Sequence, residues 1–592
     1  MIAATVHPPV APPCVPAALN RSAVLPGTTL AVSPLPDSYD ASPRSQISLL
    51  GAPAGALGGV RVSGSQTGSH GGQLLSYSQG DGASFVPSSP FRAGETVTVR
   101  GSVRAGRGTQ RFAFRFAVAL QDTAIYAAAA HVSQARDQND MQHFQSRPQL
   151  LPPVVTVTAR SPAAAPGLLF AAPYSGPGPS GPMIFDESGG LVWFDPLPRG
   201  TEATNLQVQL LGGQPVLTWW QGRITAQGFG QGEELIDDAS YRPIGRVHAG
   251  NGLQVDLHDF HITPQGTALL TAFNPIHCNL STLHGPADGG LTDSIFQEVD
   301  LQTGLVRREW HSLDHVSPSD SYSAAQGTST VWPFDYFHLN SIDQAPSGAT
   351  LISARNTSAL YELSTLTGQI LIRIGGRHSD LKLSAGAATA YQHDATVLPN
   401  GTISIFDNGA APKVHPQSRG LIVAVNPQSR TDSVLAQYAH PTALLSGSQG
   451  NIQTLENADV FLGWGSEPFF SEFSASGQLL FDAHMHGSYQ SYRAYRFAWT
   501  GTPSEPPAVA ASAPGAAPGG SITVYASWNG DTRTASWRLL AGPSAQQLAP
   551  VASAPRAGFE TAIATPGPAA FVAVQALDGS GAVLASSSTI AG

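Results

Sequence analysis

A repeated strand–turn–strand unit in the middle of the chain limits what this sequence can fold into. In its clearest copies, at residues 260–270 and 395–405, two apolar runs flank a turn that contains proline, glycine or asparagine. The turn prolines and asparagines recur at 264, 346, 399 and 457, and the longest step includes an insertion around 274–296. Because two hairpins in about 50 residues are typical of a four-stranded propeller blade, the repeat predicts a six-bladed β-propeller over 151–500.

The segments on either side of this repeat indicate two further β domains. Apolar and polar residues alternate at 60–63, 95–100 and 111–116, as in half-buried strands, and predict a small N-terminal β-sandwich. Strand-like runs after residue 521 indicate a C-terminal β-sandwich of immunoglobulin or fibronectin-III type. The predicted fold class is therefore all-β: a six-bladed β-propeller flanked by two β-sandwiches.

Composition shifts set the predicted boundaries. They are a disordered tail over 1–24, the N-terminal sandwich over 25–120, a polar and partly helical connector over 121–150, the propeller catalytic domain over 151–500, a linker over 501–520 and the C-terminal domain over 521–592. The N-terminal stretch lacks a charged start followed by a clean apolar core, so it does not indicate a signal peptide. Cys14 and Cys278 are the two thiols of the chain. Because Cys14 lies in the predicted tail, two unpaired cysteines are favoured over a disulfide.

Charge and hydropathy exclude two classes of partner. The formal net charge is −10 and charged residues make up 12% of the chain. Nucleic-acid binding needs clustered basic residues to neutralise phosphates, so no nucleic-acid partner is predicted. No apolar run approaches the roughly 18 residues of a membrane-spanning helix, so no integral membrane segment is predicted. The sequence gives no indication of the oligomeric state.

Three histidines occupy related positions in successive repeats. His258 and His393 each stand six residues before the turn proline, and His338 stands eight before Pro346. The corresponding positions of two further copies hold Asn205 and Asn451. In a propeller the first strand of each blade lines the central channel, so these five residues are expected in one ring. A single histidine at a strand start is more often a structural hydrogen-bonding group, but three in register favour a shared site. The other histidines, His311 among them, lack this register and are interpreted as surface or core residues.

A cation and several acids accompany the predicted ring. Arg355 follows the second strand of the His338 repeat, where its planar guanidinium suits the oxygens of a sulfate or carboxylate. Four aspartates flank the histidines and are candidates to orient them: Asp256, Asp259, Asp335 and Asp394. Three imidazoles could hold a metal ion with an open position. Alternatively, one imidazole could be a nucleophile while the other groups stabilise charge. Spacing alone leaves both chemistries open.

Several strings around these residues resemble the aryl sulfotransferase family, and in particular its actinobacterial and fungal branch. They are Asp256-Leu257-His258-Asp259-Phe260 with Thr263-Pro264-Gln265-Gly266-Thr267, Asp335-Tyr336-Phe337-His338-Leu339-Asn340, Gln392-His393-Asp394-Ala395 with Leu398-Pro399-Asn400-Gly401-Thr402, and Gly450-Asn451-Ile452-Gln453 with Gly463-Trp464-Gly465. The resemblance covers the whole predicted propeller. Shorter strings at 82–87 and 527–530 are also similar to those of family members.

The resemblance implies a PAPS-independent enzyme that moves a sulfuryl group from a phenolic sulfate ester to a phenol by a ping-pong mechanism. His393 would be the nucleophile that becomes sulfated, and His258, His338 and Arg355 would bind the sulfuryl oxygens and assist the phenols. Asn205 and Asn451 are expected to contact substrate, and no metal or cofactor is expected. Secretion, or a periplasmic or cell-surface location, is implied by the family alone. A metal-dependent propeller hydrolase or lyase and a non-enzymatic surface-binding propeller remain as alternatives.

Overall fold

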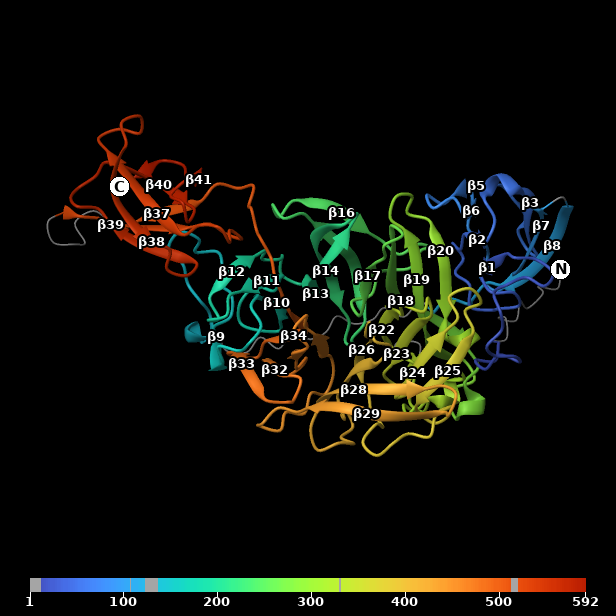
Figure 1. Ribbon diagram of the computed structural model, residues 1–592. Coiled ribbons are helices and arrows are strands. Elements are labelled where there is room, and N and C mark those ends of the chain that lie inside the picture. The colour runs from blue at the N-terminus through green and yellow to red at the C-terminus, as the bar shows by residue number, and fades with distance from the viewer. Residues whose placement is uncertain (1–11, 107, 123–136, 330–331, 513–519) are drawn as a thin grey trace, which may run out of the picture. The chain divides into compact units, whose positions relative to one another are not determined.

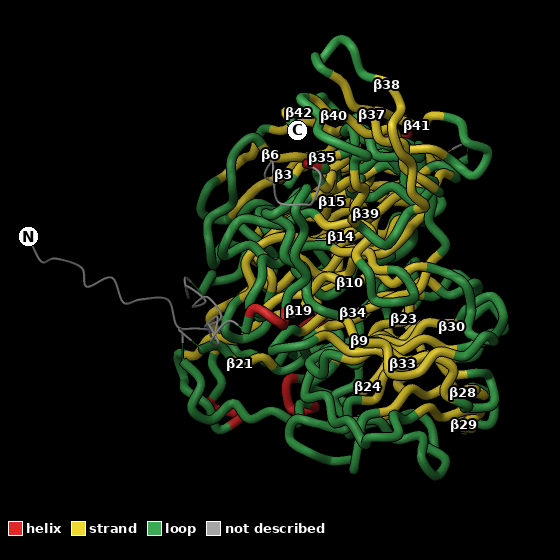
Figure 2. Tube along the Cα trace, turned by 90° about the vertical axis from the view of Figure 1, so that its left-hand side faces the viewer, coloured by secondary structure: helices red, strands yellow, loops and turns green. Residues whose placement is uncertain are grey.

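The computed structural model describes residues 12–106, 108–122, 137–329, 332–512 and 520–592. These residues are built from antiparallel β-sheets (Figure 1). Among these described residues the helices are short 3-10 turns, drawn in red in Figure 2: η1 (Ala54–Ala56), η2 (Gln138–Asp140), η3 (Ser281–Leu283), η4 (Ser312–Asp314) and η5 (Pro318–Asp320). The predicted all-β class is therefore confirmed. No helix of the described residues is long and apolar enough to cross a membrane.

The chain divides into two compact units. The first contains Met1–Ala130, Gly222–Glu234 and Val247–Ser448, and the second contains His131–Gln221, Leu235–Arg246 and Gln449–Gly592. The three candidate histidines and Arg355 belong to the first unit. Asn205 and Asn451 belong to the second.

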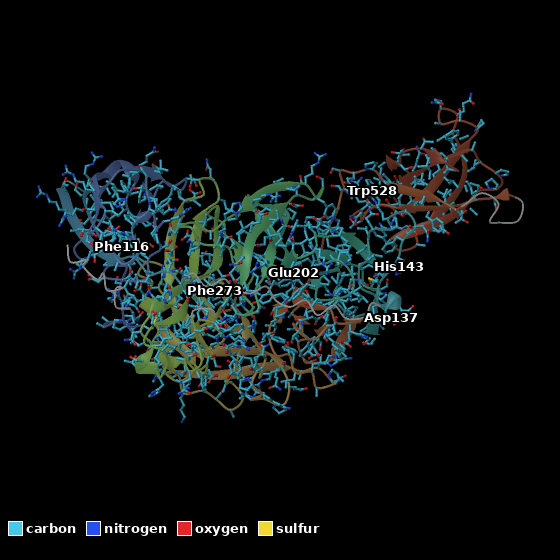
Figure 3. The ribbon with its side chains drawn as sticks, turned by 180° about the vertical axis from the view of Figure 1, so that it is seen from behind. Phe116, Asp137, His143, Glu202, Phe273 and Trp528 are labelled. Carbon is cyan, nitrogen blue, oxygen red and sulfur yellow. A yellow bond between two sulfur atoms is a disulfide. The ribbon has the colours of Figure 1, made fainter. Side chains whose placement is uncertain are left out.

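The N-terminal part of the first unit contains two four-stranded sheets. One has the order β1 (Ala31–Ser33), β2 (Ile47–Leu50), β6 (Gly82–Pro87), β5 (Gly72–Ser76), and the other has the order β4 (Gly68–His70), β3 (Leu57–Gly64), β7 (Thr96–Ala105), β8 (Gly108–Ala117). Alternate side chains from both sheets share one apolar core, in which Leu49 and Phe85 of the first sheet lie with Val99 and Phe116 of the second. Phe116 is labelled in Figure 3. The period-2 alternation of the sequence therefore corresponds to one buried face on each sheet.

Three further sheets follow one another in the first unit. Their strand orders are β17 (Phe260–Ile262), β18 (Thr267–Cys278), β19 (Gly289–Asp300), β20 (Val306–His311), with β21 (Phe334–Asp335) parallel to β19; β22 (Leu339–Gln344), β23 (Thr350–Ala354), β24 (Ala359–Leu363), β25 (Ile370–Gly375); and β26 (His393–Val397), β27 (Ile403–Asp407), β28 (Arg419–Asn426), β29 (Thr431–Tyr438). The two clearest sequence repeats are the β17–β18 and β26–β27 hairpins. Neighbouring sheets share apolar cores: Trp310 packs with Phe337 and Tyr361, and Leu360 with Ile405.

Two more sheets of this kind lie in the second unit, and a further sheet precedes β17 in the chain. The two sheets have the orders β12 (Leu191–Phe194), β11 (Met183–Phe185), β10 (Leu168–Tyr174), β34 (Gln490–Phe497) and β30 (Asn451–Thr454), β31 (Val460–Gly463), β32 (Phe469–Phe473), β33 (Leu479–Met485), β9 (Val155–Arg160). The further sheet has the order β13 (Glu202–Leu211), β14 (Gln214–Ile224), β15 (Gly230–Asp237), β16 (Pro243–Val247). The strands β9 and β10 therefore pair with strands from the end of the repeat region, more than 300 residues later.

The C-terminal segment contains two sheets around its own core. They have the orders β35 (Ala508–Ala511), β36 (Thr523–Ser527), β39 (Glu560–Ala564) and β38 (Ala549–Pro555), β37 (Ser536–Gly542), β40 (Phe571–Leu577), β41 (Val583–Ser586), with β42 (Ile590–Ala591) paired to β40. Val524, Trp528 and Trp537 belong to this core. Residues 1–11 of the predicted tail, 123–136 of the predicted connector and 513–519 of the predicted linker lie outside the described residues.

Cys14 and Cys278 form a disulfide, so the expectation of two unpaired cysteines is wrong. Cys14 is fully buried, its amide donates to the carbonyl of Asn279, and its own carbonyl accepts from the Tyr39 hydroxyl at 2.9 Å. These contacts hold residues near Cys14 against the end of β18. The proline-rich sequence gives no periodic signal of this packing, and the partner cysteine lies 264 residues away.

Loss of this disulfide is expected to destabilise the first unit. Because the bond closes a 264-residue loop, Cys14→Ser should lower the free energy of unfolding by about 2–4 kcal/mol. Thermal unfolding by circular dichroism, with and without dithiothreitol, measures the effect. The reductant should lower the Tm of the wild-type protein and leave that of the variant unchanged. Equal responses of the two proteins would contradict the prediction.

Candidate functional site

The three histidines lie at or just before the first strand of three successive sheets. His258 lies two residues before β17, His338 directly precedes β22, and His393 is the first residue of β26. Arg355 follows the last residue of β23. His338 has a φ of 58°, a left-handed conformation that is uncommon for a residue with a side chain and that marks a constrained position. The predicted register of the three histidines is therefore present in the structure.

His258 and His338 are in direct contact. Their Nε2 atoms are 3.1 Å apart and their rings are nearly perpendicular. Nδ1 of His258 hydrogen-bonds to Asp256, and Nδ1 of His338 hydrogen-bonds to Asp335 at 2.6 Å. Because both Nδ1 atoms donate to carboxylates, the contact between the Nε2 atoms is favourable when one proton lies between them. This geometry can hold a single proton between the two imidazoles, although burial lowers the pKa of His338.

His393 has different partners. Its side chain is buried, and its Nδ1 lies 2.7 Å from Oδ1 of Asn408 and 3.1 Å from the carbonyl oxygen of Tyr391. Both groups are neutral acceptors, so the proton resides on Nδ1 and Nε2 carries the lone pair. Burial, and then the charge of Arg355, hold the pKa of His393 well below its usual value of 6.5. A neutral imidazole of this kind is suited to nucleophilic attack.

Arg355 and His393 both contact Tyr391. The guanidinium carbon is 5.0 Å from the centre of the Tyr391 ring, and the Tyr391 carbonyl accepts from His393. Nη1 of Arg355 donates to Oδ1 of Asn356 at 2.8 Å, and Nη2 approaches the carbonyl of Gly447 at 3.5 Å. Burial lowers the pKa of Arg355 from its usual value of 12.5. Within the described residues its hydrogen bonds are to neutral groups, and the charge of Asp335 offsets part of the effect of burial on its pKa. Its guanidinium can therefore still bind an anion.

Buried acids lie around the histidine pair. The carboxylate of Asp256 accepts hydrogen bonds from the backbone amides of Gly230 and His258. The carboxylate of Asp259 accepts one from the amide of Ile342 at 2.7 Å. Two of the four predicted orienting aspartates, Asp256 and Asp335, hold a histidine of the pair directly. Sequence reasoning missed Glu234 on β15, which is 1% exposed. Burial, and then Asp259 and Asp256, raise its pKa well above its usual value.

Aromatic rings border the histidine pair. Phe229 and Phe273 are 4.2 Å apart between ring centres, and the His338 ring lies 5.3 Å from Phe229 and 5.9 Å from Phe273. Phe273 lies on β18 and is labelled in Figure 3. Neither phenylalanine nor Asn408 was identified from the sequence, because none of them recurs at a fixed position of the repeat. Rings in this position could stack against an aromatic substrate.

Asn205 and Asn451 are both buried in the second unit. Asn451 donates from Nδ2 to the carbonyl of Ala494 at 2.7 Å and accepts at Oδ1 from the amide of Ala494. The side-chain amide of Asn451 on β30 therefore makes two hydrogen bonds to the backbone of β34. Asn205 lies on β13 with a φ of 57°. Because these residues belong to the other unit, their contact with substrate remains a prediction.

The arrangement also bears on metal binding. Among the described residues, one group of three His, Cys, Asp or Glu ligand atoms lies within 4.8 Å of one another, and it consists of Asp40, Asp293 and His311. The three candidate histidines are not in that group. Their Nδ1 atoms are engaged with carboxylates in His258 and His338 and with neutral acceptors in His393. These features fit acid–base and nucleophilic roles.

No curated protein is significantly similar to the chain. Solved structures that resemble it include a protein of unknown function from Bacteroides caccae, with 16% identity over 56% of this chain and 99% of the other and a TM-score of 0.34. A virginiamycin B lyase from Staphylococcus aureus has 8% identity over 48% of this chain and 87% of the other, with a TM-score of 0.26. Residues 207–486, which include the three histidines and Arg355, match the model of the arylsulfotransferase (ASST) family.

Proposed function

We propose that this protein is a PAPS-independent aryl sulfotransferase that carries the sulfuryl group on His393. The observation that carries the proposal is the difference between the Nδ1 partners of the histidines. His393 faces neutral acceptors, whereas His258 and His338 each face a carboxylate. One imidazole is thereby held neutral as a nucleophile, and the other two are held as a proton-carrying pair.

In the first half-reaction, Nε2 of His393 attacks the sulfur of a phenolic sulfate ester. An N–S bond forms while the bond between sulfur and the phenolic oxygen breaks, and the electron pair leaves on that oxygen. The proton held between His258 and His338 neutralises the departing phenolate. Nδ1 of His393 keeps its proton and donates a hydrogen bond to Asn408 and to the Tyr391 carbonyl. These acceptors stabilise positive charge on the sulfated ring.

In the second half-reaction, a phenol acceptor replaces the released phenol. Its hydroxyl proton passes to the His258–His338 pair, its oxygen attacks the sulfur, and the N–S bond breaks. His393 regains its lone pair and the pair regains its proton, so the enzyme returns to its first state. The same pair serves as acid and then as base, which is why donor and acceptor can belong to one chemical class.

Arg355 is proposed to bind the oxygens of the group in transfer. A sulfuryl group carries its charge on three oxygens that are not part of the bond being broken, and a guanidinium offers a planar set of donors to them. The contact of Arg355 with the Tyr391 ring places this cation beside the backbone that holds His393. Phe229 and Phe273 are proposed to contact the phenolic ring.

The architecture that we propose around this site is the one expected from the sequence. The six sheets between β9 and β34 would be the blades of a propeller over 151–500, and the paired sheets at 25–120 and 521–592 would be two sandwiches. We also propose that the protein works outside the cytoplasm. The Cys14–Cys278 disulfide supports this location, because such bonds persist in oxidising compartments.

The function is tested by incubating the full chain with 4-nitrophenyl sulfate, with and without phenol. Release of 4-nitrophenol should require the acceptor, and phenyl sulfate should form in equal amount. In the absence of acceptor, intact-mass spectrometry should detect an acid-labile adduct of about 80 Da, the mass of SO₃ on a covalent intermediate. Release that does not depend on any phenol, with no adduct, would contradict the proposal.

Removal of the Arg355 charge should slow transfer without abolishing it. Arg355→Ala is expected to lower kcat by about 10²- to 10³-fold, the usual loss when one charge-stabilising donor is removed. Arg355→Lys should recover part of this loss, because it restores the charge without the planar donor set. Steady-state kinetics with 4-nitrophenyl sulfate and phenol measures both variants. An alanine variant with unchanged kcat would show that Arg355 does not act on the transferring group.

Asn408→Asp should move the acidic limb of the pH profile upward. A carboxylate beside Nδ1 favours the imidazolium, so the pKa of His393 should rise by about 1–3 units. Reactive neutral His393 is then lost at a higher pH as the pH falls, whereas in the wild-type protein the limb lies below pH 6.5 because the pKa is lowered. The pH dependence of kcat/KM measures the limb. Asn408→Ala is the control: it should slow transfer with no upward movement of the limb.

A further inference from the structure

A second cluster of buried ionisable side chains contains none of the proposed catalytic residues. It lies where the N-terminal segment of the first unit meets β19 and β20. Asp40 comes from the stretch between β1 and β2, Asp293 lies on β19, and His311 is the last residue of β20. One ligand atom from each of the three lies within 4.8 Å of the other two, and all three residues are at most 3% exposed.

Asp40 is the unusual member of this cluster. Both of its carboxylate oxygens are buried, and among the residues that the structure describes neither has a hydrogen-bond partner. Nδ1 of His311 lies 3.8 Å from Oδ2 of Asp40, which is beyond hydrogen-bond distance. Burial of an unpaired carboxylate is costly, and such groups are normally paired or bound to a cation. The Asp40 carboxylate therefore lies beside Asp293 and His311 as a buried group that a cation could pair with.

We propose that Asp40, Asp293 and His311 form a binding site for a zinc ion. The ligand atoms would be Nδ1 of His311 and one carboxylate oxygen from each aspartate. Nδ1 now lies 2.6 Å from Oδ2 of Asp293 and 3.8 Å from Oδ2 of Asp40. Ligand atoms around a tetrahedral zinc ion lie about 3.3 Å apart, as bonds of about 2.0–2.1 Å require. To reach this spacing, the distance from Nδ1 of His311 to Asp293 would lengthen and its distance to Asp40 would shorten, each by less than about 1 Å.

The atoms of Asp293 and His311 that would not touch the ion are already held in place. Nε2 of His311 is 3.0 Å from Oε1 of Glu309, and Glu309 accepts from Nδ2 of Asn251 at 2.8 Å. Oδ1 of Asp293 accepts from the Ser312 hydroxyl at 2.8 Å. A histidine that binds a metal through one nitrogen usually donates its other N–H to a carboxylate. His311 and Glu309 have this arrangement.

The charge around the cluster also favours a cation. Four buried carboxylates lie together, those of Asp40, Asp293, Glu309 and Asp314, and Arg21 pairs with Asp314 at 3.2 Å. A set of one imidazole and two carboxylates suits zinc, whereas calcium prefers oxygen ligands alone. Because Asp40 belongs to the N-terminal segment, a bound ion would fasten that segment to β19 and β20.

The test is zinc binding to the full chain, purified without a histidine tag and treated with chelator. Isothermal titration calorimetry should show one zinc ion per chain, and cobalt in place of zinc should give visible absorption bands. Asp40→Asn should weaken zinc binding at least about tenfold, and Glu309→Gln should weaken it by about 10- to 100-fold. His378→Ala is the matched control, because this exposed histidine also lies beside an aspartate, Asp320, at 3.5 Å. It should bind zinc as the wild-type protein does.

Absence of stoichiometric zinc binding by the wild-type protein would overturn the proposal, and so would equal Kd values for the wild-type protein and Asp40→Asn. Far-UV circular dichroism checks that each variant is folded. Should Asp40→Asn fail to fold, the cobalt spectrum of Glu309→Gln decides, because an altered spectrum supports the site and an identical one overturns it. None of these measurements depends on sulfotransferase activity.

Discussion

His393→Ala is expected to lower the rate of sulfuryl transfer by about 10⁴-fold or more, the scale of loss when a covalent nucleophile is removed. The reason is that no other imidazole of the site has neutral partners at Nδ1. The variant should also lose the adduct of about 80 Da after incubation with 4-nitrophenyl sulfate. Stopped assays of phenyl sulfate formation, followed by intact-mass spectrometry, measure both effects.

Added imidazole provides the control for this variant. A free imidazole molecule can enter the space left by the side chain and accept the sulfuryl group, so it should restore part of the release of 4-nitrophenol. It should not restore the protein adduct, because the sulfated imidazole leaves with the solvent. His378→Ala, which changes an exposed histidine, should behave as the wild-type protein. An adduct that persists in His393→Ala would place the nucleophile elsewhere.

The local repeats could be predicted from the sequence because they depend on nearby residues. The turns at Pro264 and Pro399 lie between apolar runs, and both hairpins form as expected, Phe260 with Leu270 and Thr396 with Ser404. The same regularity placed His258, His338 and His393 at equivalent positions. The family match over 207–486 confirms the resemblance at the level of the family. The specific branch remains a prediction.

Features that depend on distant segments could not be predicted. Cys14 pairs with Cys278 across 264 residues, and a proline-rich stretch carries no periodicity that reveals its partner. Asn408 fixes the tautomer of His393 from beyond the end of β27, at a position with no counterpart in the repeat. Glu234 is one of two adjacent glutamates, and only the fold shows that it is the buried one. His311 was interpreted as a surface or core residue, and the structure shows it beside three carboxylates.

Variants of the His258–His338 pair should show that the two residues act as one acid. Each single change, His258→Gln or His338→Gln, is expected to lower kcat by about 10²- to 10⁴-fold, the usual contribution of general acid–base catalysis. The double variant should lose little more than the worse single variant, because either change already removes the partner that holds the shared proton at the 3.1 Å contact. Independent roles would instead give losses that multiply.

Donors with different leaving phenols distinguish proton donation by the pair from a purely structural role of the two histidines. Departure of 4-nitrophenolate needs little protonation, whereas departure of phenolate, whose conjugate acid has a pKa of about 10, needs much more. The loss in each variant should therefore be larger with phenyl sulfate as donor than with 4-nitrophenyl sulfate. Plots of log kcat/KM against the pKa of the leaving phenol should be steeper for the variants than for the wild-type protein. If the pair only positioned the substrate, each variant would lower kcat/KM by the same factor for every donor. Parallel plots would therefore show that the pair does not donate a proton to the leaving phenolate.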